Sequence, residues 1–397
     1  MVIRDYFAED VPAEWRAFFD RQPEMIEYFS EIFGDYPFEA YGSVVINQPV
    51  NVGALETQTL PIYGAEAFSA PDPESIIVHE LAHQWFGNSV SLSDWGDIWL
   101  SESFATYAQG LWIEEIQGGK ALDNWIKTQF ESVAIDFENL VVPGEPPADD
   151  LFNFNSVYTW GSLGLHSLRE EIGDEDFFDS LRTYSDRFKD GNVTPEDFIE
   201  VAETVSDREL DPLIDRWFYS EELASIPKLG LYAGTDKDDT LSTGETDRSE
   251  VLAGLDGDDT LIGQASSNVL AGNAGNDLLE GNGAVNNNLF GGTGEDTIFA
   301  NGETNSIVGG DGSDTIWLNG ENHLVSLTTG EGRDVINNFQ LGSTTFLVRD
   351  VAELSFVKGK SGTEIMQGKD LIAIVTDTIV GTFERNADTI FASSSGS

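Results

Sequence analysis

The chain contains no cysteine among its 397 residues. Disulfide bridges are therefore excluded, and so are zinc sites built on thiolates. Any metal ion must be held by histidine, carboxylate or carbonyl groups.

Positive charge is also scarce. The chain has 20 Lys and Arg against 71 Asp and Glu, which gives a formal net charge of −51. A nucleic acid or an anionic membrane needs a basic surface, so we expect neither as a partner. The surplus of carboxylates favours a multivalent cation such as calcium, which prefers hard oxygen ligands. Solubility in a salty medium is the alternative explanation, and both can hold.

Long apolar runs are missing as well. No stretch approaches the ~20 residues that a helix needs to cross a bilayer. The first residues, MVIRDYFAED, contain no apolar core of a secretory signal peptide. We therefore expect a protein without a transmembrane segment or cleaved signal peptide, which either stays in the cytoplasm or leaves the cell through another signal.

The composition changes near residue 230. Before that point the chain is rich in Trp, Phe and apolar positions at helical spacing, and after it Gly, Asn, Asp and Thr dominate. The segment Ile226–Thr235, IPKLGLYAGT, has the turn residues of a boundary. The chain therefore has two parts that follow different structural rules.

The first part has the pattern of a mixed α+β domain. Its predicted helices run from Asp72-Pro73-Glu74 to Gly87, from Asp97 through IWLSESFATYAQGLWIEEI, over Trp160–Ile172, and from the capping box of Thr194 and Asp197. The β-branched alternation over Tyr41–Leu60 predicts strands.

The second part repeats a nonapeptide of the form GGxGxDxUx, in which U is a large apolar residue. Clear copies are Gly254–Ile262, Gly272–Glu280, Gly291–Phe299 and Gly309–Trp317, with weaker ones at Gly234–Ser242 and Thr329–Asn337. The aspartates recur 18 to 20 residues apart, at Asp239, Asp259, Asp277, Asp296, Asp314 and Asp334. Half-copies between them carry Asn instead, at Asn268, Asn287, Asn305 and, one residue short, Asn322.

Two nonapeptides make one turn of a parallel β-roll, so this alternation places the Asp loops along one edge and the Asn loops along the other. Each U side chain enters the core, and the glycines permit the positive φ of the loops. Carboxylates and carbonyls of the Asp edge can surround several structural calcium ions, with the six aspartates as the predicted ligands. Asn supplies no charge, so we expect the opposite edge to be largely free of calcium. A flexible Gly-rich linker has no reason to keep U positions in register.

These repeats resemble the RTX calcium-binding repeats of bacterial proteins exported by type I secretion. The resemblance implies an uncleaved C-terminal export signal, a type I secretion apparatus as partner and an extracellular location. Calcium outside the cell would then bind only the folded roll and drive its folding. The tail after Phe339 has strand-like stretches, TTFLV, LIAIV and DTIVGTF, before it ends in FASSSGS.

The chemistry of the first part centres on His79-Glu80-Leu81-Ala82-His83, an HExxH motif on a predicted helix. The i, i+4 spacing places both imidazoles on one helical face, where they can share one zinc, while Glu80 can reach water beside the metal. Glu102 lies 18 residues beyond His83 on the next predicted helix and completes the ligand set. Two His and one carboxylate leave a position open for water, as catalytic zinc requires. The alternative is a solvated helix that carries two of the chain's four histidines.

HELAHQW followed by DIWLSESFATY resembles the aminopeptidase N family of gluzincin peptidases, whose pattern is HExxHxW and WLNEGFA. Ser101 and Ser103 stand where the family has Asn and Gly, and neither is a metal ligand. The resemblance spans roughly residues 35 to 228 and implies a thermolysin-like fold, with a small sheet and a helical lobe. The family's usual N-terminal β-sandwich is expected to be absent, and the repeats replace its helical C-terminal domain.

Two further parts of the site rest on this resemblance. Val52–Leu60, VGALETQTL, resembles the family's GAMEN loop, so that Glu56, with Gly53 and Ala54, would bind the substrate's free amino group. Without the resemblance, Glu56 would be an ordinary acid at a strand edge. Tyr158 matches the family's catalytic tyrosine, which donates to the oxyanion, whereas read alone it would be a core aromatic. His166 and His323 have no such support, and we expect structural roles.

We therefore predict a gluzincin-like catalytic domain over residues 1–228, a calcium-binding β-roll over 229–340 and a β-rich cap with the export signal over 341–397. The predicted function is a zinc aminopeptidase in which Glu80 is the general base and Tyr158 stabilises the oxyanion. The alternatives are a secreted zinc endopeptidase with an open cleft, and a calcium-dependent surface or adhesive protein with an inactive peptidase domain.

Overall fold

The computed structural model describes residues 1–50, 53–244, 249–264, 267–282, 285–329 and 332–394. Val52 of the predicted amine-binding loop, residues 330–331 of the last weak repeat and the final residues 395–397 lie outside this description. The chain divides into a first unit, Met1–Gln129 with Leu140–Glu221, and a second unit, Phe130–Asn139 with Glu222–Ser397. Each unit is described by itself, and the boundaries predicted at 228 and 340 stay predictions.

The first unit contains a small sheet with strand order β1-β2-β4-β3. The strands are β1 (Val2–Phe7), β2 (Ala40–Val45), β3 (Ala54–Leu55) and β4 (Ile62–Tyr63). Strands β1, β2 and β4 are parallel, and β3 runs antiparallel to β4 at the edge of the sheet. A separate parallel pair joins β5 (Val90–Leu92) to β6 (Gly191–Val193).

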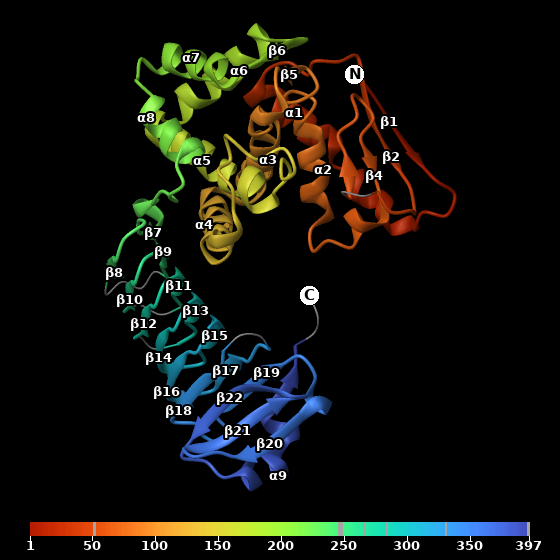
Figure 1. Cartoon of the computed structure of the whole chain (residues 1–397). Coiled ribbons are helices and arrows are strands. Elements are labelled where there is room, and N and C mark those ends of the chain that lie inside the picture. The colour runs from red at the N-terminus through yellow and green to blue at the C-terminus, as the bar shows by residue number, and fades with distance from the viewer. Residues whose placement is uncertain (51–52, 245–248, 265–266, 283–284, 330–331, 395–397) are drawn as a thin grey trace. The chain divides into compact units, whose positions relative to one another are not determined.

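The rest of the first unit is a helical lobe (Figure 1). Its helices are α1 (Gln22–Phe33), α2 (Pro73–Ala82), α3 (Trp99–Gln117), α4 (Gly119–Ile135), α5 (Gly161–Ile172), α6 (Asp174–Arg187), α7 (Pro195–Ser206) and α8 (Asp211–Ile214). Shorter turns are η1 (Ala13–Phe19), η2 (Ala65–Phe68), η3 (Trp95–Asp97) and the π-helices η5 (Phe154–Trp160) and η6 (Asp215–Tyr219). The end of α4, from Phe130 on, and the short η4 (Phe137–Asn139) belong to the second unit. Helix α3 lies at the centre of the lobe, because every residue from Trp99 to Ala108 is buried.

Helix α2 begins as the sequence predicts and ends earlier. The Asp72 carboxylate accepts from the N–H groups of Glu74 and Ser75, and Pro73 takes the first helical position. The predicted end at Gly87 is wrong, because the helix stops at Ala82 and the chain turns through residues 83–89. His83 at the cap keeps helical angles, φ −57° and ψ −19°, so the i, i+4 relation to His79 survives. The predicted capping box of Thr194 and Asp197 is confirmed.

The second unit is a parallel β-roll, as the repeats predict. Consecutive strands alternate between two sheets, and each strand up to β17 pairs in parallel with the strand two places further along, while β18 pairs with β22 (Figure 1). The roll strands are β7 (Leu231–Ala233), β8 (Thr240–Ser242), β9 (Val251–Asp256), β10 (Thr260–Gly263), β11 (Val269–Ala274), β12 (Leu278–Gly281), β13 (Asn288–Thr293), β14 (Thr297–Glu303), β15 (Ser306–Asp311), β16 (Thr315–Glu321), β17 (His323–Ser326) and β18 (Asp334–Asn337). A short turn, η7 (Pro227–Leu229), precedes them.

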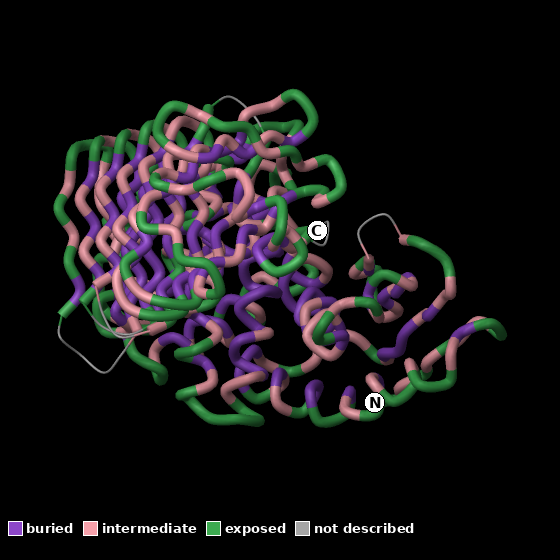
Figure 2. Tube along the Cα trace, turned by 90° about the horizontal axis from the view of Figure 1, so that it is seen from below, coloured by how far each residue is buried: buried purple, intermediate pink, exposed green. Residues whose placement is uncertain are grey.

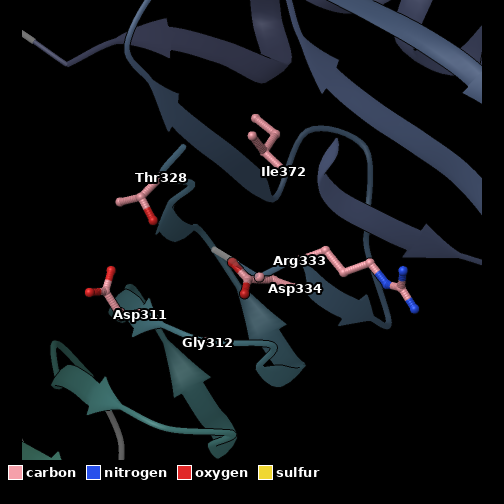
Figure 3. A pocket seen from close by; sticks show the side chains of 8 residues that line it. Asp311, Gly312, Thr328, Arg333, Asp334 and Ile372 are labelled. Carbon is pink, nitrogen blue, oxygen red and sulfur yellow. The ribbon is translucent and has the colours of Figure 1, made fainter. Parts of the chain in front are cut away.

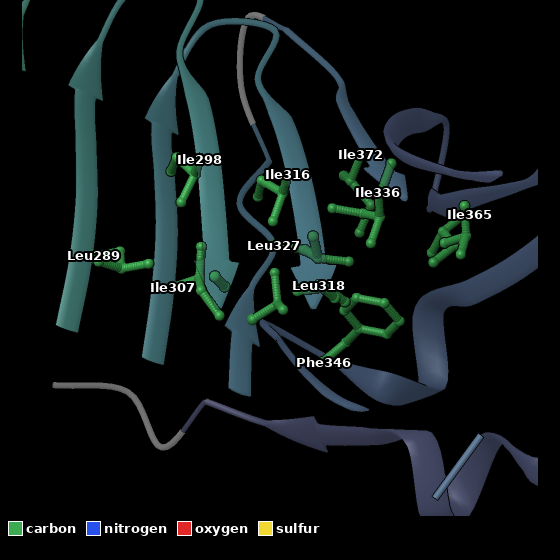
Figure 4. Close-up of a cluster of buried hydrophobic side chains, with 14 of the residues drawn as sticks. Leu289, Ile298, Ile307, Ile316, Leu318, Leu327, Ile336, Phe346, Ile365 and Ile372 are labelled. Atoms are coloured by element: carbon green, nitrogen blue, oxygen red, sulfur yellow. The ribbon is translucent and has the colours of Figure 1, made fainter. Parts of the chain in front are cut away.

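The core of the roll lies between its two sheets. Buried and less buried residues alternate along the strands, as the two-residue period of a β-strand requires (Figure 2). The U positions of the four clear repeats, Leu261, Leu279, Ile298 and Ile316, are fully buried. Figure 4 shows such side chains pointing from both sheets into one apolar layer.

A cap closes the far end of the roll. Its elements are β19 (Thr344–Val348), η8 (Val351–Glu353), β20 (Leu354–Lys358), β21 (Gly362–Gln367), β22 (Asp370–Thr376), α9 (Val380–Ile390) and β23 (Phe391–Ser393). The strand-like interpretation of DTIVGTF is wrong, because α9 begins at Val380 within it. Phe383, Ala387 and Ile390 recur at helical spacing on the face that packs against the core. Among the described helices, none is both long and apolar enough to cross a membrane.

Candidate metal centre and active site

Three potential metal ligands converge where α2 meets α3. His79 Nε2 lies 3.0 Å from His83 Nε2, and each lies 3.2 Å from Glu102 Oε2. Across the described ranges, this is the one group of three or more His, Asp or Glu side chains whose ligand atoms are this close together. The geometry brings together the three residues that the sequence predicts as zinc ligands.

The donor set fits zinc. Atoms about 2.0–2.1 Å from a tetrahedral zinc lie about 3.3–3.4 Å from one another, close to the separations seen here. Two imidazole nitrogens and one carboxylate oxygen are also the ligand types of catalytic zinc sites. The separations of the ligand atoms therefore match those of a tetrahedral zinc site.

Contacts behind the ligands fix their orientation. His83 Nδ1 lies 3.0 Å from the carbonyl oxygen of Phe86 and 3.0 Å from Ser101 Oγ. Since a carbonyl only accepts, Nδ1 carries the proton and Nε2 is left free for a metal. Gly87 makes room for this contact, because a Cβ there would come within 2.6 Å of Ser101 Oγ. The sequence analysis missed the role of Ser101, since it treated the residue only as a departure from the family pattern.

The charges of the three ligands offset one another. Burial raises the pKa of Glu102, but the two imidazoles beside it lower that pKa well below its usual range. Burial lowers the pKa of His83, and the Glu102 carboxylate outweighs this and raises it to about 10. Burial also lowers the pKa of His79. A carboxylate set between two imidazoles is thus stable in the interior of the first unit.

Glu80 lies beside this centre and takes no part in it. Its side chain is buried, and Oε2 has no hydrogen-bond partner in the protein. Burial raises the pKa of Glu80 to about 8. A carboxylate that is easily protonated and next to a metal centre suits a general base.

The centre opens into a cleft of about 550 Å³. Gly53, Ala54 and Glu56 line it from the end of edge strand β3, and the Glu56 carbonyl accepts from Asn88 Nδ2 at 2.6 Å. Tyr158 lines it from the π-helix η5, with its ring stacked on His79 at 5.8 Å between centroids and 15° between planes. The cleft therefore unites every residue that the sequence predicts for the peptidase site.

Three exposed aromatic rings also line this cleft. Trp95, Phe152 and Phe154 are 64%, 55% and 66% exposed. Trp95 packs against Phe152 at 6.3 Å, and Phe154 stacks on Tyr158 at 5.4 Å. The sequence analysis missed these rings, because nothing in their spacing distinguishes them from core residues.

The two predicted structural histidines lie outside the cleft. His166 is buried, and its Nδ1 lies 3.1 Å from the Tyr107 hydroxyl. His323 is buried in the roll, with no hydrogen-bond partner for either ring nitrogen.

In the roll, the predicted calcium ligands form a ladder. Oδ1 of each aspartate accepts from the N–H of the aspartate one turn earlier, at 2.7 Å from Asp259 to Asp277 and 2.8 Å from Asp277 to Asp296. The other oxygen, Oδ2, is buried without a partner in Asp259, Asp277, Asp296 and Asp314. At Asp296 this oxygen borders, with the Gly309 carbonyl, the space left by the missing side chain of Gly291. Unpartnered carboxylate oxygens beside carbonyls fit calcium.

The ladder is costly to keep charged without a cation. Burial, reinforced by the neighbouring carboxylates, raises the pKa of Asp259 to about 6, of Asp277 to about 7 and of Asp296 to about 8. Asp239, at the start of the row, has a partner for its Oδ2, which accepts from the backbone and hydroxyl of Thr235.

The last turn of the ladder encloses a cavity of about 10 Å³, shown in Figure 3. Asp311, Thr328 and Asp334 line it, and the Arg333 side chain extends away from them. Burial and the Asp314 charge raise the pKa of Asp334 to about 8.

The opposite edge of the roll is a ladder of neutral Asn side chains that follows Glu250. Asn268, Asn287 and Asn305 are buried, and Oδ1 of each accepts from the N–H one turn earlier, at 3.0–3.1 Å. The sequence placed Asn322 next in this row, and that interpretation is wrong. Strand pairing aligns Asn305 with His323, while Asn322 sits before the strand in the left-handed region at φ +61°. The step from Asn305 to His323 is 18 residues, the same as from Asn287 to Asn305, so His323 takes the row position and the Asn stands one residue before it.

Comparison with known proteins identifies the family of the chain. Residues 18–217 match the family model described as the peptidase family M1 domain. The chain belongs to peptidase family M1. Residues 246–279 and 281–316 match the RTX calcium-binding nonapeptide repeat. Zinc is the metal that the M1 family implies, and calcium is the ion that the repeats imply.

Curated relatives include aminopeptidase N of Streptomyces lividans, 29% identical over 258 residues that cover 60% of this chain and 29% of that protein. Glutamyl aminopeptidase of Sus scrofa is 26% identical over 212 residues, covering 49% and 22%. Among solved structures, the M1 zinc metallopeptidase of Deinococcus radiodurans is 33% identical with a TM-score of 0.47, covering 54% of this chain and 48% of that one. This M1 chain thus spans less than a third of the length of these two curated relatives.

Proposed function

We propose that this chain is a zinc-dependent aminopeptidase. The observation that carries the proposal is the convergence of His79, His83 and Glu102 at 3.0–3.2 Å, beside a buried Glu80. Relatives named as aminopeptidases support the same activity. The cleft that Tyr158 and Glu56 line supplies the remaining groups that such a reaction needs.

Each residue has one task in the proposed mechanism. When bound, zinc supplies Lewis acidity to water and to the peptide carbonyl. Glu80 accepts the proton of the attacking water and passes it to the leaving amine. The Tyr158 hydroxyl donates to the oxyanion of the tetrahedral intermediate, a contribution of roughly 3–4 kcal/mol for a well-placed donor.

Two features of the cleft support cleavage from the N-terminus. Glu56 offers a carboxylate for the substrate ammonium, beside edge strand β3, along which an extended peptide can pair. None of the described residues that line the cleft is Lys or Arg, so no cation is present to bind a C-terminal carboxylate.

The exposed rings of Trp95, Phe152 and Phe154 favour an apolar side chain near the scissile bond.

The test compares free and N-acetylated aminoacyl reporters with the zinc-loaded protein. We expect Glu80→Gln to keep zinc and lose turnover, by roughly 100-fold or more. Glu56→Ala should lose the preference for the free amine, whereas Glu39→Ala, which changes an exposed acid away from the cleft, should keep it. Equal cleavage of the acetylated reporter by the unchanged protein would instead identify an endopeptidase. A protein that binds no zinc and cleaves neither reporter would favour the adhesive alternative.

We propose further that the protein is exported and that its roll folds on calcium outside the cell. The RTX match, the charge of −51 and the unpartnered Asp oxygens support this. The test is expression with and without a type I secretion system, followed by detection of the chain in the medium. Equal amounts in the medium under both conditions would contradict the export route.

A further inference from the structure

The tyrosine of the proposed site lies on an unusual turn. Residues Phe154–Trp160 form a π-helix, in which Gly161 N–H donates to the carbonyls of Ser156 and Tyr158 and not to that of Val157. A regular α-helix would pair Gly161 with Val157, four residues back. The π-turn thus changes the course of the backbone around Tyr158, as such turns often do at functional sites.

Ser103 binds the carbonyl that this turn changes. It follows Glu102 on α3, is fully buried, and its Oγ donates to the Val157 carbonyl at 2.7 Å. The space for its side chain comes from Gly161, where a Cβ would overlap Ser103 Oγ and lie 2.8 Å from Ser103 Cβ. Ser103 and Gly161 therefore form a matched pair between the helix that carries Glu102 and the turn that carries Tyr158.

The Tyr158 side chain is held by its own contacts and by its backbone. Its ring contacts are Phe154, which is 66% exposed, and His79, which is itself a predicted ligand, and its hydroxyl has a hydrogen bond to Glu102. The buried bond from Ser103 to the Val157 carbonyl, one residue away, holds the backbone from which this side chain starts.

We propose that Ser103 is a positioning residue: its hydroxyl holds the π-turn so that the Tyr158 phenol meets the developing oxyanion. This inference rests on the role given to Tyr158 in the proposed function. Because that hydrogen bond forms only in the transition state, a displaced phenol lowers kcat and leaves KM nearly unchanged. The metal ligands do not touch the Ser103 hydroxyl, so zinc binding should not change.

The test is a double-mutant cycle with Ser103→Ala, Tyr158→Phe and the double variant. We expect Ser103→Ala to lower kcat by roughly 10- to 100-fold, with KM within about twofold. In the Tyr158→Phe background the same change should have less than a threefold effect. Affinity for a phosphinic peptide, a tetrahedral mimic measured by calorimetry, should fall in parallel, while zinc affinity stays the same.

A matched control and a second perturbation separate positioning from stability. Ser180 is also buried and donates to a carbonyl, that of Asp176, away from the cleft, so Ser180→Ala should lower stability without changing kcat. Gly161→Ala should disturb the pair from the other side. The double variant Ser103→Gly with Gly161→Ala removes the steric overlap but does not restore the hydroxyl. Its stability should therefore recover, while its kcat should stay low.

The outcomes distinguish this inference from the proposed function. If Tyr158→Phe is harmless in turnover and in analogue binding, the role of Tyr158 fails, and the inference with it. If Tyr158→Phe is damaging but Ser103→Ala is harmless, or if the two effects add in full, the positioning role alone is overturned.

Discussion

In the first unit, the buried carboxylate of Glu102 lies 3.2 Å from the ring nitrogens of His79 and His83, whereas in the roll each buried aspartate is followed by another one turn later. The imidazoles lower the pKa of Glu102 far below its usual range. Burial and neighbouring carboxylates raise the pKa of Asp296 to about 8. The carboxylate of the first unit thus lies beside groups that favour its charge, and the carboxylates of the roll lie beside groups that oppose it.

The difference indicates how each metal is coupled to folding. The predicted zinc ligands sit on α2, at its C-terminal cap and on α3, whose packing is set by the core of the lobe, so we expect the lobe to fold without zinc. The predicted calcium ligands belong to the loops of the roll itself, and Oδ2 is buried without a partner in four of these aspartates. We therefore expect calcium to contribute directly to the folding free energy of the roll.

The largest effect is expected when each metal is removed in turn from the full chain, because amide protection or turnover should then be lost. Refolding with zinc but without calcium should leave amides of the roll strands unprotected, while α2 and α3 stay protected. Refolding with calcium but without zinc should leave both regions protected and abolish turnover. Hydrogen exchange resolved by peptide measures this, and a roll that is equally protected without calcium would contradict the comparison.

Most of this contrast could be predicted from the sequence. HExxH with Glu102 identifies the metal centre, and the nonapeptide period identifies the roll, because both are fixed spacings with a direct geometric meaning. The early end of α2 could not be predicted, since Gln84, Trp85 and Phe86 are compatible with a helix and the turn depends on tertiary contacts. The same holds for α9. Its β-branched start resembles a strand, and the helix depends on the packing of Phe383, Ala387 and Ile390 against the core.

The contacts around the ligands were harder to predict. Ser101 and Ser103 differ from the family pattern, and the sequence alone gives no reason to assign them a function. Their hydroxyls form hydrogen bonds with residues far away in the chain, Ser101 with His83 and Ser103 with Val157. The two positions on either side of Glu102 thus serve different parts of the site.

The next largest effect is expected on zinc affinity when Ser101 is changed. We expect Ser101→Ala to weaken zinc binding by roughly tenfold, because the hydroxyl that orients His83 is lost while the Phe86 carbonyl remains. Competition with a chelator measures the affinity. Ser103→Ala is the matched control and should bind zinc like the unchanged protein. Equal zinc affinity in both variants would mean that the Phe86 carbonyl alone fixes the ring.

In the roll, Asp296→Asn gives the Asp edge the chemistry of the Asn edge at one position. The side-chain oxygen can still accept from Asp277 N–H, but a charged calcium ligand is lost. We expect the calcium concentration at the folding midpoint to rise by several-fold, measured by circular dichroism. Asp239→Asn should have a smaller effect, since Thr235 already binds its Oδ2. Equal shifts would show that an unpartnered oxygen does not mark the stronger calcium ligand.

The smallest effect tests the uncharged edge. Asn287→Ala leaves the buried N–H of Asn268 without an acceptor, which costs about 1–3 kcal/mol of folding free energy. Because no cation is bound at this edge in our interpretation, the cost should be the same at every calcium concentration that folds the roll. Asn319→Ala, which removes an exposed amide from the neighbouring Asn301–Asn319 contact, should change stability by less than about 0.5 kcal/mol. Denaturant unfolding at two saturating calcium concentrations measures both variants. If the cost at Asn287 changes with calcium, the Asn edge also binds the ion, and the two edges are not the opposites that their charges suggest.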